Sequence, residues 1–206
     1  MSAQLRVVNL VATAFMDCTV DLIKCAEAMG GKCGSNELPS CVIRSAKPRV
    51  TAMIMANGKL LFCGARKPED IMQVAWALLL KLYRKNLIAE PGVTLMNLHV
   101  ENIVCSYSLG FEINVELFYN DHADTSVYQP QIISPCQFYP DGSGRVIVIY
   151  GTGECIVTGS RTFEEAIATS KLVDWRKYQL GHEYRPFEST RSVKKQKQKQ
   201  SKGDKE

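Results

Sequence analysis

The side chains that could do chemistry in this sequence are two asparagines set among small apolar residues. Asn9 opens the run Asn-Leu-Val-Ala-Thr-Ala, and Asn102 opens the similar run Asn-Ile-Val-Cys-Ser-Tyr, 93 positions later. Amide side chains both donate and accept hydrogen bonds. The pair therefore points to a binding surface rather than to a catalytic centre.

An enzyme would need a nucleophile beside a base, and Cys105 with His122 is the pair to test. No constellation of Asp, His and Cys recurs at a useful spacing. The eight cysteines include no C-x-x-C pair, and there are three histidines. We therefore expect reduced, mostly buried thiols, with no metal site, no cofactor and no enzymatic activity.

A second repeated segment follows each asparagine run. Met55-Ala-Asn-Gly-Lys-Leu-Leu-Phe-Cys-Gly-Ala-Arg66 recurs as Tyr150-Gly-Thr-Gly-Glu-Cys-Ile-Val-Thr-Gly-Ser-Arg161, with its glycines and terminal arginine in step. The pattern predicts a turn, a short strand and a second turn. Because this offset is 95 positions and the first is 93, the halves are duplicates that differ by a small insertion.

The first half reads as strands and helices in a definite order. A β-branched and apolar run predicts a strand over Leu5–Ala14, and a helix over Asp21–Met29 stops at Gly30-Gly31. Short antiparallel strands then follow over Ser40–Ser45, Arg49–Met55 and Lys59–Cys63, with a turn at Lys47-Pro48. A helix that starts at Pro68 and carries one apolar stripe closes the half. The stripe consists of Ile71, Ala75, Leu78, Leu79 and Leu82.

The second half repeats this order after a junction at Pro91-Gly92. Thr162 and Glu165 have capping-box spacing, which predicts a helix running to about Tyr178. The chain from about Ser189 has no apolar residue after Val193 and is expected to be disordered. We therefore predict two repeats, 1–95 and 96–187, and a disordered basic tail, 188–206.

The predicted fold class is α+β, a pseudo-twofold arrangement of two repeats, each an antiparallel sheet with helices on one face. If Leu60, Phe62, Cys155 and Val157 pack on the helices, alternation turns their neighbours to the other face. Those outward residues are Asn9, Val11, Leu61, Cys63, Asn102, Val104, Ile156 and Thr158. A solvated sheet face should be charged, so something covers this one. A ligand, a second copy of the chain and an intramolecular lid all remain open.

Charge divides unevenly along the chain. The net charge of +4 equals that of the tail, whereas residues 1–95 carry +5 and residues 96–187 carry −5. No cationic leader precedes an apolar run, and no run approaches the roughly 20 residues of a membrane span. A cytosolic or nuclear protein is expected.

Several motifs together resemble the TATA-box-binding protein family. They are the Asn-[Ile/Leu]-Val openings, Ile43-Arg44 with Lys47-Pro48-Arg49, Asn57-Gly58-Lys59 with Gly64-Ala65-Arg66, Tyr128-x-Pro130, and Thr158-Gly159-Ser160-Arg161. The resemblance covers roughly residues 5 to 181. It implies a saddle whose concave sheet sits in the minor groove of DNA, where apolar wedges enter base steps.

The resemblance also implies which side chains contact DNA. The family's amides correspond to Asn9 and Asn102, its apolar floor to Val11, Leu61, Val104 and Ile156, and its paired threonines to Cys63 and Thr158. Its wedges correspond to Leu38, Met55, Ile133 and Tyr150, and its phosphate-binding cations to Arg44, Arg49, Lys59, Arg66 and Arg161. None of the four wedges is phenylalanine, so weaker kinking of TATA sequences is expected.

The second half departs further from the family pattern. Glu154 stands in place of a lysine and Tyr139 in place of an arginine, and Asp141-Gly-Ser-Gly-Arg145 replaces a Lys-Pro-Arg turn. The segment Gln129–Ile133 lacks the acids with which the family binds its B-type general transcription factor. The expected partners are double-stranded promoter DNA in the nucleus, the A-type general transcription factor and other promoter-binding complexes, with no membrane and no small-molecule substrate. A protein-interaction scaffold that does not bind DNA is the alternative.

Overall fold

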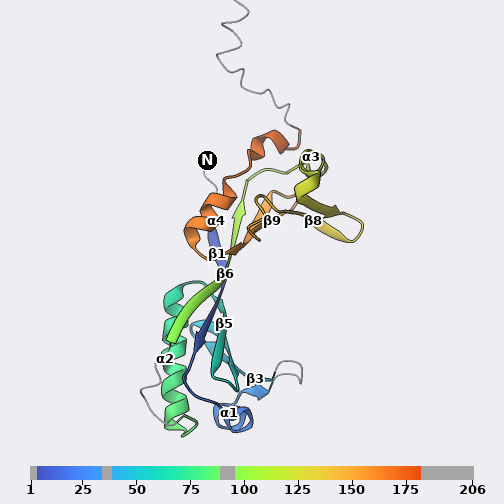
Figure 1. The fold of residues 1–206 in the computed structure, drawn as a ribbon. Helices are drawn as coiled ribbons and strands as arrows, with labels where there is room; N and C mark the ends of the chain where they lie inside the picture. Colours follow the sequence, from blue (N-terminus) through green and yellow to red (C-terminus); the bar gives the residue numbers. More distant parts are fainter. Residues whose placement is uncertain (1–3, 34–38, 89–95, 182–206) are drawn as a thin grey trace, which may run out of the picture.

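The computed structural model describes residues 4–33, 39–88 and 96–181. It shows two similar halves joined by long central strands (Figure 1). The predictions for Leu38, for the Pro91-Gly92 junction and for the tail lie outside the described residues.

One antiparallel sheet of ten strands runs through both halves. Its strand order is β2-β3-β4-β5-β1-β6-β10-β9-β8-β7, so the second half mirrors the first about the β1–β6 pair. The first five strands are β1 (Arg6–Phe15), β2 (Lys32–Cys33), β3 (Ser40–Ala46), β4 (Arg49–Met55) and β5 (Lys59–Ala65). The others are β6 (Met96–Ser108), β7 (Ser126–Gln129), β8 (Ile133–Phe138), β9 (Val146–Ile149) and β10 (Glu154–Ser160). The sequence had not predicted the two-residue β2.

The β1–β6 register has the symmetry of a duplicated chain. Asn9 lies opposite Val104, and Val11 lies opposite Asn102, on either side of the Leu10–Ile103 pair. Each asparagine therefore faces the valine of the other repeat across a local twofold. This arrangement confirms the predicted pseudo-twofold α+β fold.

Helices pack against one face of the sheet. The helices are α1 (Leu22–Met29), α2 (Pro68–Arg84), α3 (Val115–Asp121) and α4 (Phe163–Ser170), with 3-10 turns η1 (Ala123–Thr125) and η2 (Trp175–Tyr178). The helices α2 and α4 lie on the same side of the sheet (Figure 1). Figure 1 also shows the β7–β8 hairpin extending away from that side.

The helix α2 forms where its sequence predicted it. Pro68 occupies the first turn, and Glu69 and Asp70 complement the positive end of the helix dipole. The predicted stripe is buried, together with Val74, which the prediction had omitted.

The prediction that the last helix runs to about Tyr178 is wrong. The Thr162–Glu165 capping box is present, but α4 ends at Ser170. The Thr169 and Ser170 hydroxyls donate to the carbonyls of Glu165 and Ile167, a bonding pattern that disfavours a continuing helix. The chain then forms the 3-10 turn η2, in which Trp175 and Tyr178 are buried against Phe118.

The core lies between the helices and the sheet. Leu10, Ala12 and Ala14 of β1 are buried there, and so are Leu60 and Phe62 of β5. In β10, Cys155 and Val157 are likewise fully buried. The predicted alternation of buried and outward-facing residues is thus confirmed. The outward-facing residues lie on the sheet face that the helices do not cover.

Replacing Phe62 with alanine should lower the free energy of unfolding by about 3–5 kcal/mol, because the fully buried ring would leave a cavity. Urea denaturation measures the loss. Ile132→Ala is the control, since Ile132 is 77% exposed and its truncation should change stability by less than about 0.5 kcal/mol. Equal small losses in both variants would contradict the buried position of Phe62.

Candidate nucleic-acid interface

The sheet face opposite α2 and α4, here called the open face, has a small apolar and polar centre. We call eight of its residues the central patch: Asn9, Val11, Leu61, Cys63, Asn102, Val104, Ile156 and Thr158. All eight are partly exposed. They lie on β1, β5, β6 and β10, the four innermost strands of the sheet. The structure therefore brings together eight of the predicted site residues.

Each asparagine of the central patch is oriented by a backbone donor. The N–H of Gly64 donates to Asn9 Oδ1 at 2.8 Å, and the N–H of Gly159 donates to Asn102 Oδ1 at 2.9 Å. Because an N–H needs an acceptor, these bonds fix which end of each amide is the oxygen. Each amide NH2 group has two hydrogens, so at least one N–H of each asparagine is left as a donor for a ligand.

Sheet irregularities place these glycine donors. The β1–β5 register shifts between Leu10 and Ala12, and the β6–β10 register shifts between Val157 and Ser160. Gly64 and Gly159 lie in these shifts at φ values of 93° and 86°, which glycine adopts without strain. The amide oxygens therefore bond N–H groups that the regular ladder does not use.

The two halves of the central patch differ at one position. Thr158 Oγ1 lies 3.2 Å from Asn102 Nδ2, which donates to it. In the first repeat the corresponding residue is Cys63, whose thiol is a weaker hydrogen-bonding group. The Asn102 amide is consequently held at both ends by strong partners, whereas Asn9 has only its oxygen held in this way.

Sequence reasoning missed a carboxylate beside the central patch. Thr13 Oγ1 donates to Glu101 Oε1 at 2.7 Å across β1 and β6. This bond is the main cause that lowers the pKa of Glu101, and the charges of His99, Arg161 and Lys59 lower it further. Glu101 is therefore an anion between cations expected to bind phosphate. It precedes Asn102 in the asparagine run, but pairing alone shows that it is the extra residue of a bulge.

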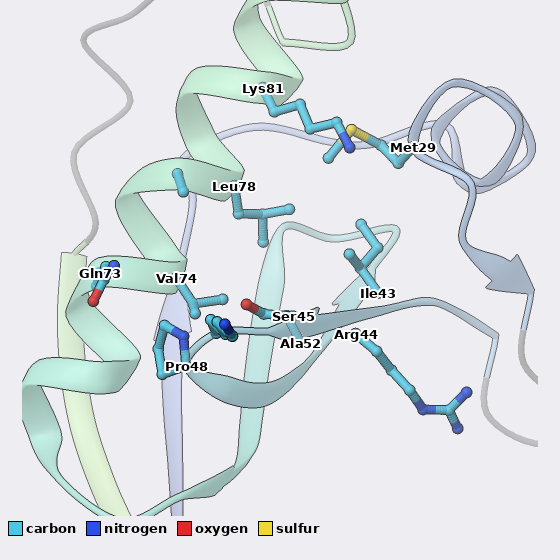
Figure 2. A pocket seen from close by; sticks show the side chains of 12 residues that line it. Met29, Ile43, Arg44, Ser45, Pro48, Ala52, Gln73, Val74, Leu78 and Lys81 are labelled. Carbon is cyan, nitrogen blue, oxygen red and sulfur yellow. The ribbon is translucent and has the colours of Figure 1, made fainter.

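The first-repeat cations lie on β3, β4 and β5 or, for Arg66, directly after β5. Arg44, Arg49 and Arg66 are exposed, and Lys59 is partly exposed. Arg44 extends away from α2 in Figure 2, whereas Val74 and Leu78 point from α2 toward the sheet. None of the four cations forms an ion pair with another residue in the described part of the chain.

The second repeat offers less free positive charge. Arg145 forms an ion pair with Asp141, and its Nε donates to Ser143 Oγ at 2.7 Å. Arg161 is exposed, and Glu101 interacts electrostatically with it as well as with Lys59 of the first repeat. Glu154 is exposed at the start of β10, the position that corresponds to Lys59.

Three of the four predicted wedges are described. Met55 and Tyr150 begin equivalent turns, because the N–H of Gly58 donates to the Met55 carbonyl and that of Gly153 to the Tyr150 carbonyl. Ile133, at the start of β8, is 48% exposed. The structure thus places Met55 and Tyr150 at corresponding positions of the two repeats.

The structure gives no support to a Cys105–His122 catalytic pair. The Cys105 thiol is fully buried, and burial raises its pKa, which disfavours the reactive thiolate. His122 Nε2 instead lies 3.1 Å from Tyr178 Oη, and its ring contacts Phe118 and Phe138.

Within the described residues no group of three or more acidic, histidine or cysteine side chains could hold a metal ion. No helix in the described ranges is long and apolar enough to cross a membrane. A cavity of about 230 Å³ lies under α2 beside the β3–β4 hairpin, lined by Met29, Ile43 and Leu78 among others (Figure 2).

Comparisons with known proteins agree with this architecture. The family model "Transcription factor TFIID (or TATA-binding protein, TBP)" matches residues 4–85 and 97–173. A TATA-box-binding protein of Pyrobaculum neutrophilum is 31% identical over 169 residues, covering 80% of this chain and 82% of that protein. One from Bombyx mori is 28% identical over 160 residues, covering 76% of this chain and 50% of that protein.

A solved structure supports the fold independently. The TBP of Methanococcus jannaschii superposes with a TM-score of 0.71 at 21% identity. The alignment covers 82% of this chain and 94% of that chain.

Removing the Thr13 hydroxyl should raise the pKa of Glu101 toward its ordinary value. A folded-state pKa that is lowered contributes stability above the unfolded pKa, and this contribution is lost as the pH falls through the folded pKa. Thr13→Val should therefore reduce that loss at acid pH. Carbon NMR titration of the Glu101 carboxyl measures the shift. Glu165, whose pKa is lowered chiefly by the Arg161 backbone N–H, is the internal control and should not move.

Proposed function

Because the chain belongs to the TATA-binding protein family, we propose that its open face binds promoter DNA in the minor groove. The protein would act there as a divergent transcription initiation factor. It would grip phosphates mainly through its first repeat and rely on partners to assemble a preinitiation complex.

The orientation of the two amides is the observation that carries this proposal. Both amide oxygens accept from glycine N–H groups, so two NH2 donors flank the local twofold. The minor groove offers acceptors at adenine N3 and thymine O2, and a guanine there adds an obstructing N2 amino group. Two donors in an otherwise apolar patch suit an A·T-containing groove.

The charge distribution supports phosphate contacts that are stronger in the first repeat than in the second. Four cations of the first repeat form no ion pair within the described residues: Arg44, Arg49, Lys59 and Arg66. In the second half, Asp141 neutralises Arg145, which leaves Arg161 as the one cation there expected to bind phosphate. Glu101 interacts electrostatically with both Arg161 and Lys59, so it does not distinguish the two halves. Phosphate contacts dominate the affinity of such interfaces, so binding by the isolated protein would be weak.

The wedge positions favour shallow kinking of the DNA. Met55, Ile133 and Leu38 are aliphatic, and Tyr150 carries a hydroxyl. Aliphatic side chains can enter a base step, but they lack the aromatic face whose stacking contributes roughly 1–3 kcal/mol per base. Reduced specificity for TATA sequences is therefore part of the proposal.

Partners would supply what the DNA contacts lack. We propose nuclear promoter complexes, among them the A-type general transcription factor, as the assembly context. The second repeat, 96–187, carries a net charge of −5 and could meet a basic partner, while the first repeat, 1–95, grips DNA. The basic tail, 188–206, would add a nonspecific DNA contact.

Asn9→Asp and Asn102→Asp test the amide contact directly. An aspartate can still accept from the glycine N–H but presents an anion where the amide presents a donor. We expect each variant to weaken binding to an A·T-rich duplex by about tenfold or more, or roughly 1.4 kcal/mol. Fluorescence anisotropy with a labelled duplex measures the change.

Asn114→Asp is the matched control. It makes the same charge change at the N-cap of α3, where Asn114 Oδ1 accepts from the Leu117 N–H and aspartate caps equally well. If the control weakens binding as much as the test variants, the effect is one of net charge. If the parent protein binds no duplex, alone or with nuclear extract, the scaffold alternative replaces this proposal.

If phosphate contacts come mainly from the first repeat, cations of the two repeats should contribute unequally to the salt dependence of DNA binding. Lys59→Ala and Arg49→Ala should each reduce the slope of log K against log salt by about one, because each removes one phosphate contact. Arg161→Ala should reduce it less, and Glu154→Lys should strengthen binding. Anisotropy titrations across a salt series measure the slopes, and equal changes for Lys59→Ala and Arg161→Ala would contradict the asymmetry.

A further inference from the structure

The helix α2 exposes a row of large apolar side chains to solvent. Trp76 is 54% exposed, Leu80 48%, Tyr83 38% and Met72 37%. We call these four residues the outer stripe. They follow one another at intervals of four, four and three, so they form one line along the helix. The line spans three turns, a length of about 17 Å.

The outer stripe is separate from the side of α2 that holds the helix to the sheet. Ile71, Val74, Ala75, Leu78, Leu79 and Leu82 fill that side and are buried. A surface helix normally needs one apolar stripe, and α2 has two. Contiguous exposed apolar surface of this kind typically marks a protein interaction site.

Charges at the two ends of the outer stripe define an orientation. Glu69 lies one turn before Met72, and Arg84 lies one turn after Leu80, on the same side of the helix. A helix that packs antiparallel on α2 would place its own N-terminal turns beside Arg84.

We propose that the outer stripe of α2 docks an amphipathic helix of a partner protein in antiparallel orientation. The partner helix presents about four apolar residues at intervals of three or four. It carries acidic residues in its first two turns, opposite Arg84, and basic residues in its last turns, opposite Glu69. Its own dipole favours the same charge order, because acids stabilise the start of a helix and bases its end.

Charge favours such a partner over a second copy of the chain. Two copies meeting through α2 would bring together two first repeats, each with a net charge of +5. The tail of the same chain is also unsuitable, since residues 189–206 contain one large apolar residue, Val193, among many lysines. A partner with acidic N-terminal turns meets neither obstacle.

The docking site is independent of DNA binding. The helix α2 packs on the sheet face opposite the open face (Figure 1). A partner helix on the outer stripe therefore leaves the central patch uncovered, and the protein can hold both ligands together. Failure of DNA binding would leave this inference standing, and the reverse also holds.

A synthetic peptide of about five turns tests the proposal. It carries four leucines at intervals of four, four and three, glutamates in its first two turns, lysines in its last two and a fluorescein label. We expect saturable binding to the full chain with a Kd of about 10–100 µM, measured by anisotropy. A peptide with the leucines replaced by serine should not bind.

Variants of the protein locate the peptide. Trp76→Glu should weaken binding at least about tenfold, as expected for a central aromatic anchor, and Arg84→Glu should weaken it several-fold. Leu172→Glu is the matched control, because Leu172 is 56% exposed in the second repeat, and it should bind as the parent does. Leu80→Glu replaces Trp76→Glu if circular dichroism shows that the latter does not fold.

Three results would overturn the proposal. One is the absence of binding to the full chain, and another is equal weakening by Leu172→Glu and Trp76→Glu. The third is a mass that doubles with concentration in sedimentation equilibrium and returns to the monomer value in Trp76→Glu, which would assign the stripe to a second copy.

Discussion

The pairing of β1 with β6 is the constraint on which the rest of the structure depends. These strands belong to different repeats, and their antiparallel ladder turns two small sheets into one of ten strands. The same ladder places Asn9 against Val104 and Val11 against Asn102, so the recognition groups meet at the centre. Neither repeat alone would present two amides across a twofold.

Duplication kept the backbone while the side chains diverged. Glycines with positive φ occupy equivalent turns and bulges in both repeats, and equivalent N–H groups hold the two asparagines. The charges around them do not match, because Lys59 corresponds to Glu154 and the exposed Arg49 has no comparably free counterpart beside the Asp141–Arg145 pair. The two repeats therefore share nearly the same backbone but differ in surface charge, so the first repeat attracts a polyanion more strongly than the second.

The sequence predicted the parts of the fold that rest on periodicity and glycine spacing. The buried side of α2 and the alternation in β5 and β10 follow from patterns of period 3.6 and 2, and the structure confirms them. The end of α4 was not predictable in this way, because Thr169 and Ser170 bond to backbone carbonyls within an otherwise helical sequence. Glu101 was missed because its position depends on a bulge, and a bulge is a property of two paired strands.

That bulge has a twin, and the pair bears on the curvature of the molecule. Val8 in β1 and Glu101 in β6 are each one residue more than the opposite strand contains, and they lie 93 positions apart at corresponding places in the two repeats. A bulge bends its strand and increases the local twist. A source of curvature is thus part of the repeating unit itself, and doubling the unit placed one such bulge on each side of the local twofold. Removing Val8 would reverse the faces of the residues on one side of it, so one extra residue affects both the local bend of β1 and the face on which Asn9 lies.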